Sequence, residues 1–564
     1  MTIDRAEPNP VVAGVGSALL FAVVAVAVTW PLASDLDAGI PLGTETVATV
    51  PLFNLWTLAW NVESIGRGYS GYWQAPIFHP SPDAFALSEP QPLTGLLAAL
   101  LVALGASSLS AYNILVLAAL VTNGWLATVV SRRAGLGWLP ATGAGLAVLL
   151  LPFTHQELGV LQLVPLAGLL LWALAILRFR DAPHAANGLL LGLALAVAFG
   201  LSSQLTLLGV LAGTPAVVWL WWPRLGERRT WWGLAAGAAA FLLLTSPLTA
   251  AQLRATSSSG FERSLESVRQ HSAAPEHYLT AAWRPLVPTP GIEVAERPSQ
   301  RAFWPGALRL LLAAVALGAA WRTGRFRRLA IAGALLTATA LVLSLGAHFA
   351  LGELSLAGVL RLLPGVSQLR SYFRFALWVQ IGLTALAALG LEQVAHATSQ
   401  RLSPVKVRLL VTVLAALMAL EIRPSQSPIE PLPPLDLELP WIEWILTSTE
   451  PDDVLAFVPF PEGRSSRAYL GTSQWMYWQL RHWRPMVNGY SGFFPSHFKE
   501  LKRTMAEFPS DAALRALDDA GVEYCIVHQS FLRGAIAPSP EAAERLVPVF
   551  RDERHGLIVL ALRP

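Results

Sequence analysis

The sequence predicts a polytopic α-helical membrane protein that carries a C-terminal α/β domain. Of its 564 residues, 54% are hydrophobic and only 14% are charged, a balance typical of membrane proteins. The apolar residues form long runs, and short loops with arginines separate these runs. After residue 434 the composition changes to that of a soluble domain.

The apolar runs predict about eleven membrane spans. The first run is long for a signal-peptide core, and no small-residue cleavage pattern follows it, so we expect it to remain as a membrane helix. The predicted spans are Val11–Thr29, Ala111–Val130, Trp138–Pro152, Leu158–Leu177, Asn187–Leu201, Leu205–Trp222, Trp232–Leu248, Pro305–Ala320, Leu329–Gly346, Phe375–Leu391 and Val407–Leu420.

Arginine clusters predict which loops face the cytoplasm, because short loops rich in Lys and Arg stay on that side. The long loop after the first span has a single arginine, Arg67, so we expect it outside, with the N-terminus in the cytoplasm. An odd number of spans then places the C-terminal domain outside as well. The clusters that share the cytoplasmic side are Arg132/Arg133, Arg178/Arg180, Arg224/Arg228/Arg229, Arg322/Arg325/Arg327/Arg328 and Arg401/Lys406/Arg408.

The first outer loop, residues 32–110, is far longer than an ordinary connection. Its many aromatic residues argue against disorder. Between Pro51 and Pro76 apolar residues recur at helical spacing, which predicts a helix in the membrane interface with its aromatic side chains at headgroup depth. The run from Pro92 to Gly105 is short for a span, and we expect a second interfacial or re-entrant helix there.

These patterns divide the chain into a transmembrane domain (1–423), a proline-rich linker (424–434) and a C-terminal domain (435–564). Residues 249–304 form another outer loop, whose low hydrophobicity predicts a mobile flap. In the C-terminal domain the expected strands are Asp453–Pro459, Val522–His528 and Gly556–Leu562, and the expected helices are Trp441–Leu446, Ser496–Phe508 and Asp511–Ala520.

Composition and motifs exclude several classes of function. The net charge is only +3, and the topology accounts for the arginines, so we expect no nucleic-acid partner. The single cysteine, Cys525, rules out a disulfide framework. Walker loops, Rossmann glycine patterns and HExxH histidines are missing from the sequence, so soluble nucleotide and hydride chemistry loses support. We expect no metal and no cofactor.

Three acids in the first outer loop are candidate catalytic bases. Asp35 and Asp37 follow the first span closely, and Glu45 comes after them. A carboxylate that membrane and protein partly shield has the raised basicity needed to take a proton from a hydroxyl. The alternative for each acid is a solvated loop residue or a helix cap.

Two further pairs are candidates for binding a phosphate-bearing substrate. His155 and Glu157 lie in the outer turn between the third and fourth spans, where ionisable residues are often functional, although they can also simply meet water. Arg370 and Arg374 are four residues apart at the start of the tenth span, so they share a helix face and can grip a phosphate. Ordinary snorkelling of arginine at a helix end is the alternative.

The aromatic segment from Trp475 to Pro495 has two possible uses. Aromatic side chains suit the faces of sugars, but they equally suit docking against the membrane or the loops of the membrane domain. We favour docking.

With these features, the chain resembles the GT-C superfamily of membrane glycosyltransferases, and in particular a poorly characterised bacterial branch of it. The matching patterns are Gly43 followed by Pro51-Leu52-Phe53-Asn54-Leu55-Trp56, then Tyr72-Trp73-Gln74-Ala75-Pro76-Ile77-Phe78-His79-Pro80, Ser88-Glu89, Leu363-Pro364-Gly365, Leu369-Arg370, Arg374-Phe375 and Asn488-Gly489-Tyr490-Ser491-Gly492. One position departs from the pattern, since many relatives have Gly-Asp where this chain has Gly43-Thr44-Glu45.

The resemblance implies an enzyme of the bacterial inner membrane that moves a sugar from a polyprenyl-phosphate-linked donor to a cell-envelope glycan or protein. It implies a catalytic acid in the first outer loop, either Glu45 or one of Asp35 and Asp37. It also implies substrate-binding roles for the acids, aromatic residues and amides of the matching patterns, namely Asn54, Trp56, His79 and Glu89. The alternatives are a non-catalytic assembly scaffold and a transporter of lipid-linked sugars; few charges lie deep in the spans, which weighs against transport.

Overall fold

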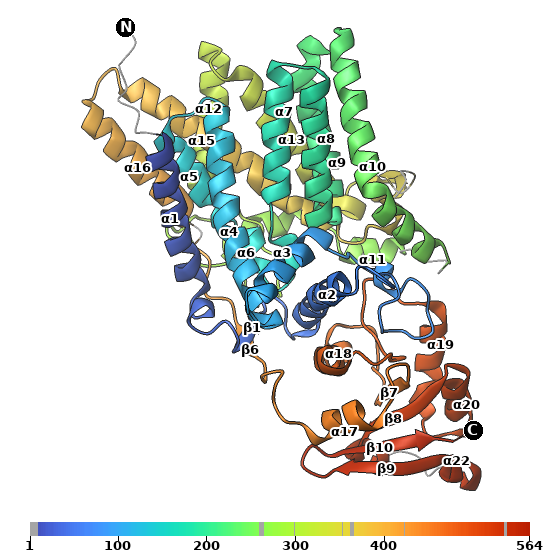
Figure 1. Cartoon of the computed structure of the whole chain (residues 1–564). Coiled ribbons are helices and arrows are strands. Elements are labelled where there is room, and N and C mark those ends of the chain that lie inside the picture. The colour runs from blue at the N-terminus through green and yellow to red at the C-terminus, as the bar shows by residue number, and fades with distance from the viewer. Residues whose placement is uncertain are drawn as a thin grey trace.

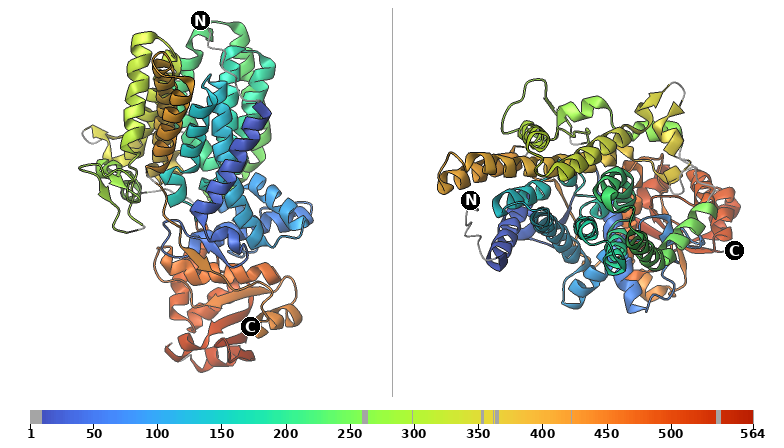
Figure 2. Two further views of the ribbon diagram at one scale, coloured as in Figure 1. Left: turned by 90° about the vertical axis from the view of Figure 1, so that its left-hand side faces the viewer. Right: turned by 90° about the horizontal axis from the view of Figure 1, so that it is seen from above.

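A computed structural model describes residues 10–258, 264–297, 299–351, 354–360, 362, 366–421, 423–534 and 539–563. A bundle of long helices forms one end of the molecule, and a region of strands and shorter helices forms the other (Figure 1). Figure 2 shows the two parts stacked along the long axis. The predicted fold class, a polytopic helical membrane protein with a C-terminal α/β region, is confirmed.

The helices of the bundle coincide with the predicted apolar runs. Among the described residues, 8 helical segments are long and apolar enough to cross a membrane. The predicted spans at 187–201, 305–320 and 407–420 fall on helices of 17 residues each, so the number eleven stays a prediction. The bundle helices are α1 (Pro10–Thr29), α4 (Ser108–Arg133), α5 (Trp138–Leu149), α7 (Ala167–Asp181), α8 (Ala185–Leu201), α9 (Ser203–Trp221), α10 (Arg228–Ser258), α12 (Ala307–Thr323), α13 (Arg327–Leu345), α15 (Ala376–Thr398) and α16 (Pro404–Leu420).

Helices α8 and α10 pack together through glycines. A Cβ atom on Gly188 would lie 1.9 Å from the carbonyl oxygen of Gly233, and one on Gly192 would lie 2.0 Å from that of Gly237. Small residues let membrane helices approach until their backbones touch, which replaces the hydrophobic driving force that lipid does not supply.

The first outer loop folds into α2 (Thr49–Gly66), α3 (Pro92–Ala103) and the short strand β1 (Gly39–Pro41), which pairs with β6 (Ile429–Pro431) of the proline-rich linker. The aromatic residues of α2 are covered by protein and not by lipid, and their depth relative to the headgroups stays a prediction. Trp56 is 0% exposed and Trp60 is 3% exposed, because α2 lies between the bundle and the C-terminal region (Figure 1). Helical spacing of apolar residues shows a buried face but not whether lipid or protein covers it.

The C-terminal region contains a four-stranded sheet in the order β7-β8-β10-β9. Strand β8 runs parallel to β7 and antiparallel to β10, which also pairs with β9 in antiparallel fashion. The elements are α17 (Pro440–Ser448), β7 (Val454–Val458), α18 (Leu470–His482), α19 (Ser496–Thr504), α20 (Asp511–Asp519), β8 (Val522–His528), α21 (Gln529–Gly534), α22 (Pro540–Arg545), β9 (Leu546–Asp552) and β10 (Leu557–Leu562).

The remaining segments outside the bundle helices contain short helices and strands. The flap predicted at 249–304 begins as a continuation of α10, then forms α11 (Leu265–Gln270) and a parallel pair of short strands, β2 (Thr280–Ala281) and β3 (Glu293–Val294). After α13 come β4 (Ala350–Leu351), β5 (Leu354–Ser355) and α14 (Leu356–Leu360). The family pattern at Leu363-Pro364-Gly365 lies outside the described residues.

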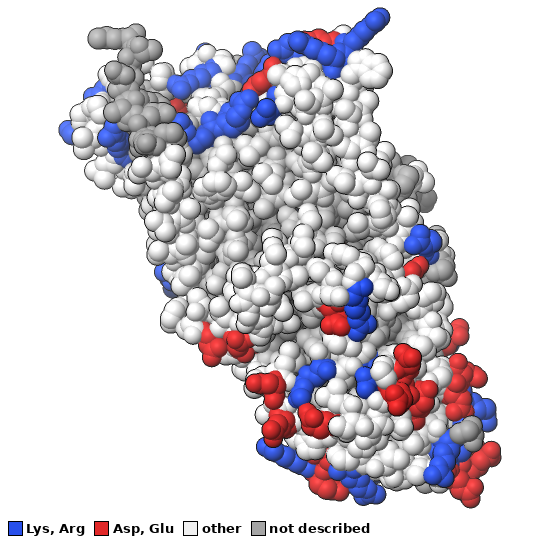
Figure 3. All heavy atoms as spheres, in the orientation of Figure 1, with Lys and Arg blue, Asp and Glu red and all other residues white. Residues whose placement is uncertain are grey.

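Charged side chains are unevenly distributed over the surface. Lys and Arg gather at the end of the bundle opposite the C-terminal region, and the middle of the bundle is nearly free of charge on the face shown (Figure 3). This distribution is the one that the positive-inside rule predicts for a cytoplasmic end. The multi-pass membrane fold follows, while the assignment of sides stays a prediction.

Candidate active site

A glycine contact brings the first outer loop against the turn after α6 (Pro152–Gln156). Gly43 has a φ of +59°, and a Cβ there would lie 2.4 Å from the carbonyl oxygen of Gln156. The next residue, Thr44, donates from its backbone N–H to the same oxygen at 2.8 Å and from Oγ1 at 2.9 Å. Gly159 is equally restricted, because its Cβ would lie 2.3 Å from the carbonyl oxygen of Leu42. Two loops far apart in the sequence are thereby held in contact.

This contact places two carboxylates and an arginine together. Glu45 lies two residues after Gly43 in the first loop, and its charge interacts with those of Glu157 and Arg374. Arg374 lies 3.9 Å from Glu157, measured from Nη2 to Oε2, and the two side chains are 18% and 14% exposed. Among the described residues no hydrogen bond occupies the carboxylate of Glu45, which is partly exposed.

The surroundings make Glu45 a stronger base than an ordinary glutamate. Burial raises its pKa to about 7, the neighbouring Glu157 adds to the rise, and Arg374 opposes it. Burial also raises the pKa of Glu157, against the attraction of Arg374 and Arg301. A carboxyl group with a pKa near neutral pH can accept a proton from a reacting hydroxyl and release it again.

Arginines form one wall of this cluster. Arg301 comes from the segment before α12, and both Arg370 and Arg374 precede the tenth predicted span. The prediction that these two arginines share a helix face is wrong, because the helical turn begins only at Tyr372 and Arg370 lies before it. Burial lowers the pKa of Arg370, with a further lowering by Arg374. Burial also lowers the pKa of Arg301, Glu157 opposes this shift, and both of the other arginines add to it. The three guanidinium groups are therefore close enough to repel one another, and an anion placed between them would relieve this repulsion.

Arg374 is held in position and still keeps a free donor. Its Nη1 donates to Oε1 of Gln204, the second residue of α9. Glu89 fixes this helix end, because its Oε1 accepts from the Ser203 hydroxyl and from the Gln204 backbone N–H, each at 2.9 Å. Nε of Arg374 is buried without a hydrogen-bond partner among the described residues. Glu89, a predicted binding residue, thus positions Arg374 indirectly, through Gln204.

Tyr490 brings the C-terminal region into the cluster. Burial raises its pKa to about 12, and the charge of Glu45 adds to the rise, whereas Arg370 opposes it. Asn488 fixes the loop of Tyr490 both to strand β7 and to the first loop. The Asn488 side chain bonds to the backbone N–H and carbonyl of Phe457 at 2.7 and 2.9 Å, and its own carbonyl accepts from the Phe78 N–H at 3.0 Å.

Two of the predicted acids lie apart from the cluster. Asp37 is exposed and accepts hydrogen bonds from the hydroxyls of Ser107 and Ser110, so it holds the N-terminus of α4. Asp35 is also exposed, and its Oδ1 accepts from the backbone N–H of Asp37 at 3.1 Å. The catalytic role of these two acids stays a prediction, although the structure makes Asp35 a solvated loop residue and joins Asp37 to the serine hydroxyls at the N-terminus of α4, whose N-cap is Ser107.

The predicted binding residues Asn54, Trp56 and His79 also receive structural positions. The amide of Asn54 is buried, donating to the Val50 carbonyl and accepting from Gln91 at 3.0 Å. Trp56 donates to Oε1 of Gln479 on α18 at 2.9 Å. The backbone N–H of His79 donates to the Met486 carbonyl at 3.0 Å. Asn54 thus ties the first loop to itself, whereas Trp56 and His79 join it to the aromatic segment from Trp475 to Pro495, in agreement with the preferred docking role.

His155 is buried, and its Nε2 lies 2.9 Å from the carbonyl oxygen of Leu149, so this nitrogen is used inside the protein. The predicted hydrogen bond from His155 to a phosphate cannot come from Nε2, because this nitrogen already bonds to the Leu149 carbonyl oxygen. The residue also lines a cavity of about 380 Å³. The other lining residues include Gly43, Thr44, Gln156, Trp283, Arg297, Gln300 and Ser425.

Three members of the cluster were missed from the sequence. Arg301 and Gln204 stand in segments without a pattern of their own, and only their positions in space reveal them. Tyr490 does lie within the matching Asn488–Gly492 pattern, so its signal was present although no role was given to it. Among the described residues no group of three or more His, Cys, Asp or Glu side chains is placed to hold a metal ion.

Replacing Gly43 by alanine should dismantle the cluster. The left-handed backbone costs a non-glycine residue about 1–2 kcal/mol, and the new Cβ would meet backbone atoms that cannot move away. We expect a lower thermal midpoint of the purified protein and the loss of most of its activity. Gly66→Ala is the matched control, because a Cβ at Gly66 meets no atom within 4 Å. Equal behaviour of the two variants would contradict the proposed contact.

Neither a protein-family model nor a curated protein sequence matches the chain. The structure is similar to that of arabinofuranosyltransferase AftD from Mycobacteria, with a TM-score of 0.57 and 15% identity, over 100% of this chain and 40% of AftD. A mutant of AftD gives a TM-score of 0.54 and 13% identity, over 100% of this chain and 42% of that one. ArnT from Cupriavidus metallidurans in the apo state gives a TM-score of 0.48 and 15% identity, over 97% of this chain and 98% of ArnT.

Proposed function

The chain has the fold of the GT-C glycosyltransferases, and we propose that it transfers a sugar from a polyprenyl-phosphate-linked donor to a cell-envelope acceptor on the outer face of the bacterial inner membrane. One observation carries the proposal. Glu45, a partly exposed carboxylate with a pKa of about 7, interacts with Glu157 and Arg374, and Arg374 in turn lies close to Arg301 and Arg370. The likeness to AftD supports glycosyl transfer in general.

In the proposed reaction Glu45 takes the proton of the acceptor hydroxyl while the oxygen attacks C1 of the donor sugar. The bond between C1 and the phosphate oxygen breaks, and its electron pair leaves with the polyprenyl phosphate. Arg370 and Arg374 bind this phosphate and stabilise the charge that it gains as it leaves. The free Nε of Arg374 supplies a donor for it.

The proposed reaction has a definite pH dependence. Glu45 acts as a base only when it is ionised, and its pKa is raised to about 7. Activity should therefore be low at pH 6, rise through about pH 7 and level off above it. The measurement is kcat/KM between pH 5.5 and 9 with a fixed donor. A profile that is flat across pH 7 would contradict the assignment of Glu45.

We propose that the reaction needs no metal. The arginines carry the positive charge that a metal ion would otherwise supply, and the described residues offer no group of three metal ligands. Activity of the purified protein should survive dialysis against EDTA. Loss of activity that Mg²⁺ or Mn²⁺ restores would overturn this part of the proposal.

The rival function is an assembly scaffold that keeps the fold without catalysis. A scaffold has no need for a buried, mutually repelling set of charges, whereas such sets recur where enzymes bind substrates. The cluster at Glu45 therefore favours the enzyme. A transporter is disfavoured because the sequence places few charges deep in the predicted spans.

The direct test presents purified full-length protein in nanodiscs with a panel of polyprenyl-phosphate sugars that carry a radioactive label. Release of polyprenyl phosphate and transfer of label to envelope extracts are the expected results. In parallel, lipopolysaccharide, glycoprotein and exopolysaccharide of a deletion strain are compared with those of the parent. No turnover of any donor together with an unchanged envelope would overturn the proposal.

A further inference from the structure

A second pocket lies at the opposite end of the bundle, among the ends of α7, α9 and α13. Its volume is about 470 Å³, which is far more than a phosphate ion fills. Three arginines from different elements line it, Arg180, Arg224 and Arg328, together with one acid, Asp181. Leu220 and Pro223 complete the lining. None of these residues takes part in the cluster around Glu45.

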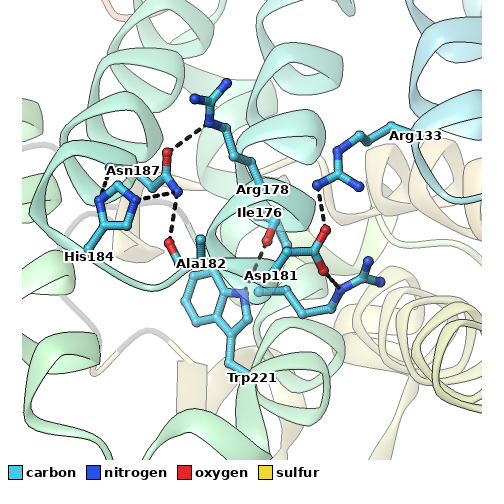
Figure 4. A network of polar contacts seen from close by, with 9 residues as sticks. Arg133, Ile176, Arg178, Asp181, Ala182, His184, Asn187 and Trp221 are labelled. Carbon is cyan, nitrogen blue, oxygen red and sulfur yellow. Dashed lines mark hydrogen bonds and ion pairs between the residues drawn. The ribbon is translucent and has the colours of Figure 1, made fainter.

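The positive charge of this pocket is only partly neutralised. Asp181 is bound by Arg133 on one side and by Arg180 at 2.8 Å on the other (Figure 4), so its carboxylate is already balanced. Glu227 pairs with both Arg224 and Arg229, at 2.9 and 2.5 Å. The side chain of Arg328 has no partner within the described part of the chain. The pocket therefore keeps an excess of positive charge.

The walls of the pocket are fixed by hydrogen bonds between helices. Trp221 donates from Nε1 to the Ile176 carbonyl at 3.2 Å, which ties α9 to α7 (Figure 4). Trp219 donates to the Arg328 carbonyl at 3.2 Å, which ties α9 to α13. The three helix ends thus hold the arginines around one space, unlike arginines that stand singly at the end of a helix.

Exposed tryptophans mark the depth of the pocket in the membrane. Trp222, beside Pro223, is 67% exposed, and Trp231 and Trp232 are 59% and 73% exposed. Tryptophan is enriched at the level of the lipid headgroups. We therefore expect the arginines to lie at the level of the headgroup phosphates, and Leu220 lines the same space from a bundle helix.

From these observations we propose that the pocket binds the headgroup of an anionic phospholipid of the cytoplasmic leaflet. Basic pockets between membrane helices on that side are suited to such headgroups. The positive-inside rule explains why arginines occur at this end, but it requires neither a fixed cavity nor convergence from three helix ends. The lipid would bridge α7, α9 and α13 and so hold the cytoplasmic end of the bundle together. The inference is independent of the reaction proposed for the other end.

The test measures binding of a fluorescent phosphatidylglycerol to the full-length protein in detergent. Arg224→Gln combined with Arg328→Gln should weaken binding by about 30-fold, since each arginine near the headgroups contributes about 5-fold. Glu227 keeps Arg229 as its partner in this variant. The single change Arg328→Gln removes no ion pair among the described residues and should weaken binding by about 5-fold. This single variant replaces the double variant in the test if the double variant does not fold.

The matched control is Arg401→Gln with Arg408→Gln, which removes the same charge from exposed positions in a cluster predicted to share this side. Its binding should stay within about twofold of the parent. Equal weakening by both pairs would reduce the effect to general surface charge and overturn the site. Competition by phosphatidylcholine equal to that by phosphatidylglycerol would remove the anion requirement. Competition by millimolar inorganic phosphate alone would make this a free-phosphate site and overturn the lipid assignment.

Discussion

Glu45→Gln is expected to lower the turnover of sugar transfer by about 10²- to 10⁴-fold, the usual contribution of a general base. The amide has the shape of the carboxyl group but cannot take the proton of the acceptor. Donor binding should change little, so the loss should appear in kcat more than in KM. The measurement is transfer of labelled sugar under saturating donor at pH 8, where the wild-type carboxyl group is ionised.

The stability of this variant separates a lost base from a lost fold. The folded-state pKa of Glu45 lies above its ordinary value of 4.5, so its ionisation opposes folding. The favourable contribution of the protonated form is complete below pH 4.5 and disappears as the pH rises through about 7. At pH 8 the wild type therefore bears the cost of a buried charge, and Glu45→Gln should have an equal or higher thermal midpoint.

Asp35→Asn is the control for this experiment, because Asp35 is an exposed acid of the same loop whose Oδ1 only accepts from its own turn. It should keep nearly full activity. Wild-type turnover in Glu45→Gln, or an equal loss in Asp35→Asn, would show that the base has been assigned wrongly. Glu157→Gln would then be the next variant to examine.

The position of the acids shows what the sequence alone could not decide. Asp35, Asp37 and Glu45 share one loop and have similar local surroundings in the sequence, and their distinction arises from a tertiary contact. Gly43 fits against the turn at Gln156 only because it has no Cβ, and that contact carries Glu45 to Glu157. The match of Gly43-Thr44-Glu45 to the family's Gly-Asp pattern, with the acid one position later, pointed to Glu45. The sequence does not reveal that the turn at Gln156 packs against this segment.

The fold was predictable where burial produces an unambiguous pattern. The continuous apolar runs of β7, β8 and β10 gave the right strands, because these residues are mostly buried. Strand β9 was missed, since it contains Pro548 and lies at the sheet edge, where only Asp552 of its residues is buried. Proline is tolerated in such edge strands, where a backbone donor can be absent.

Arg374→Gln is expected to lower kcat/KM by about 10²- to 10³-fold, the range seen when one donor to a developing negative charge is removed. In the proposed reaction this arginine holds the phosphate that leaves with the lipid. Its removal also has an effect on Glu45, because Arg374 lowers the pKa of that carboxyl group. The rising limb of the pH profile should therefore move to higher pH.

Arg374→Lys separates the two roles of this side chain. Lysine keeps the positive charge, so the rising limb should stay near the wild-type pH, but it cannot match the forked geometry of guanidinium toward a phosphate, so kcat/KM should still fall. Arg254→Gln is the control, since Arg254 is 61% exposed and lies 3.7 Å from Asp83, outside the cluster. If both changes at Arg374 lower activity without any shift of the pH profile in the glutamine variant, then Arg374 does not act on Glu45, and the shared site proposed for acid and arginine must be abandoned.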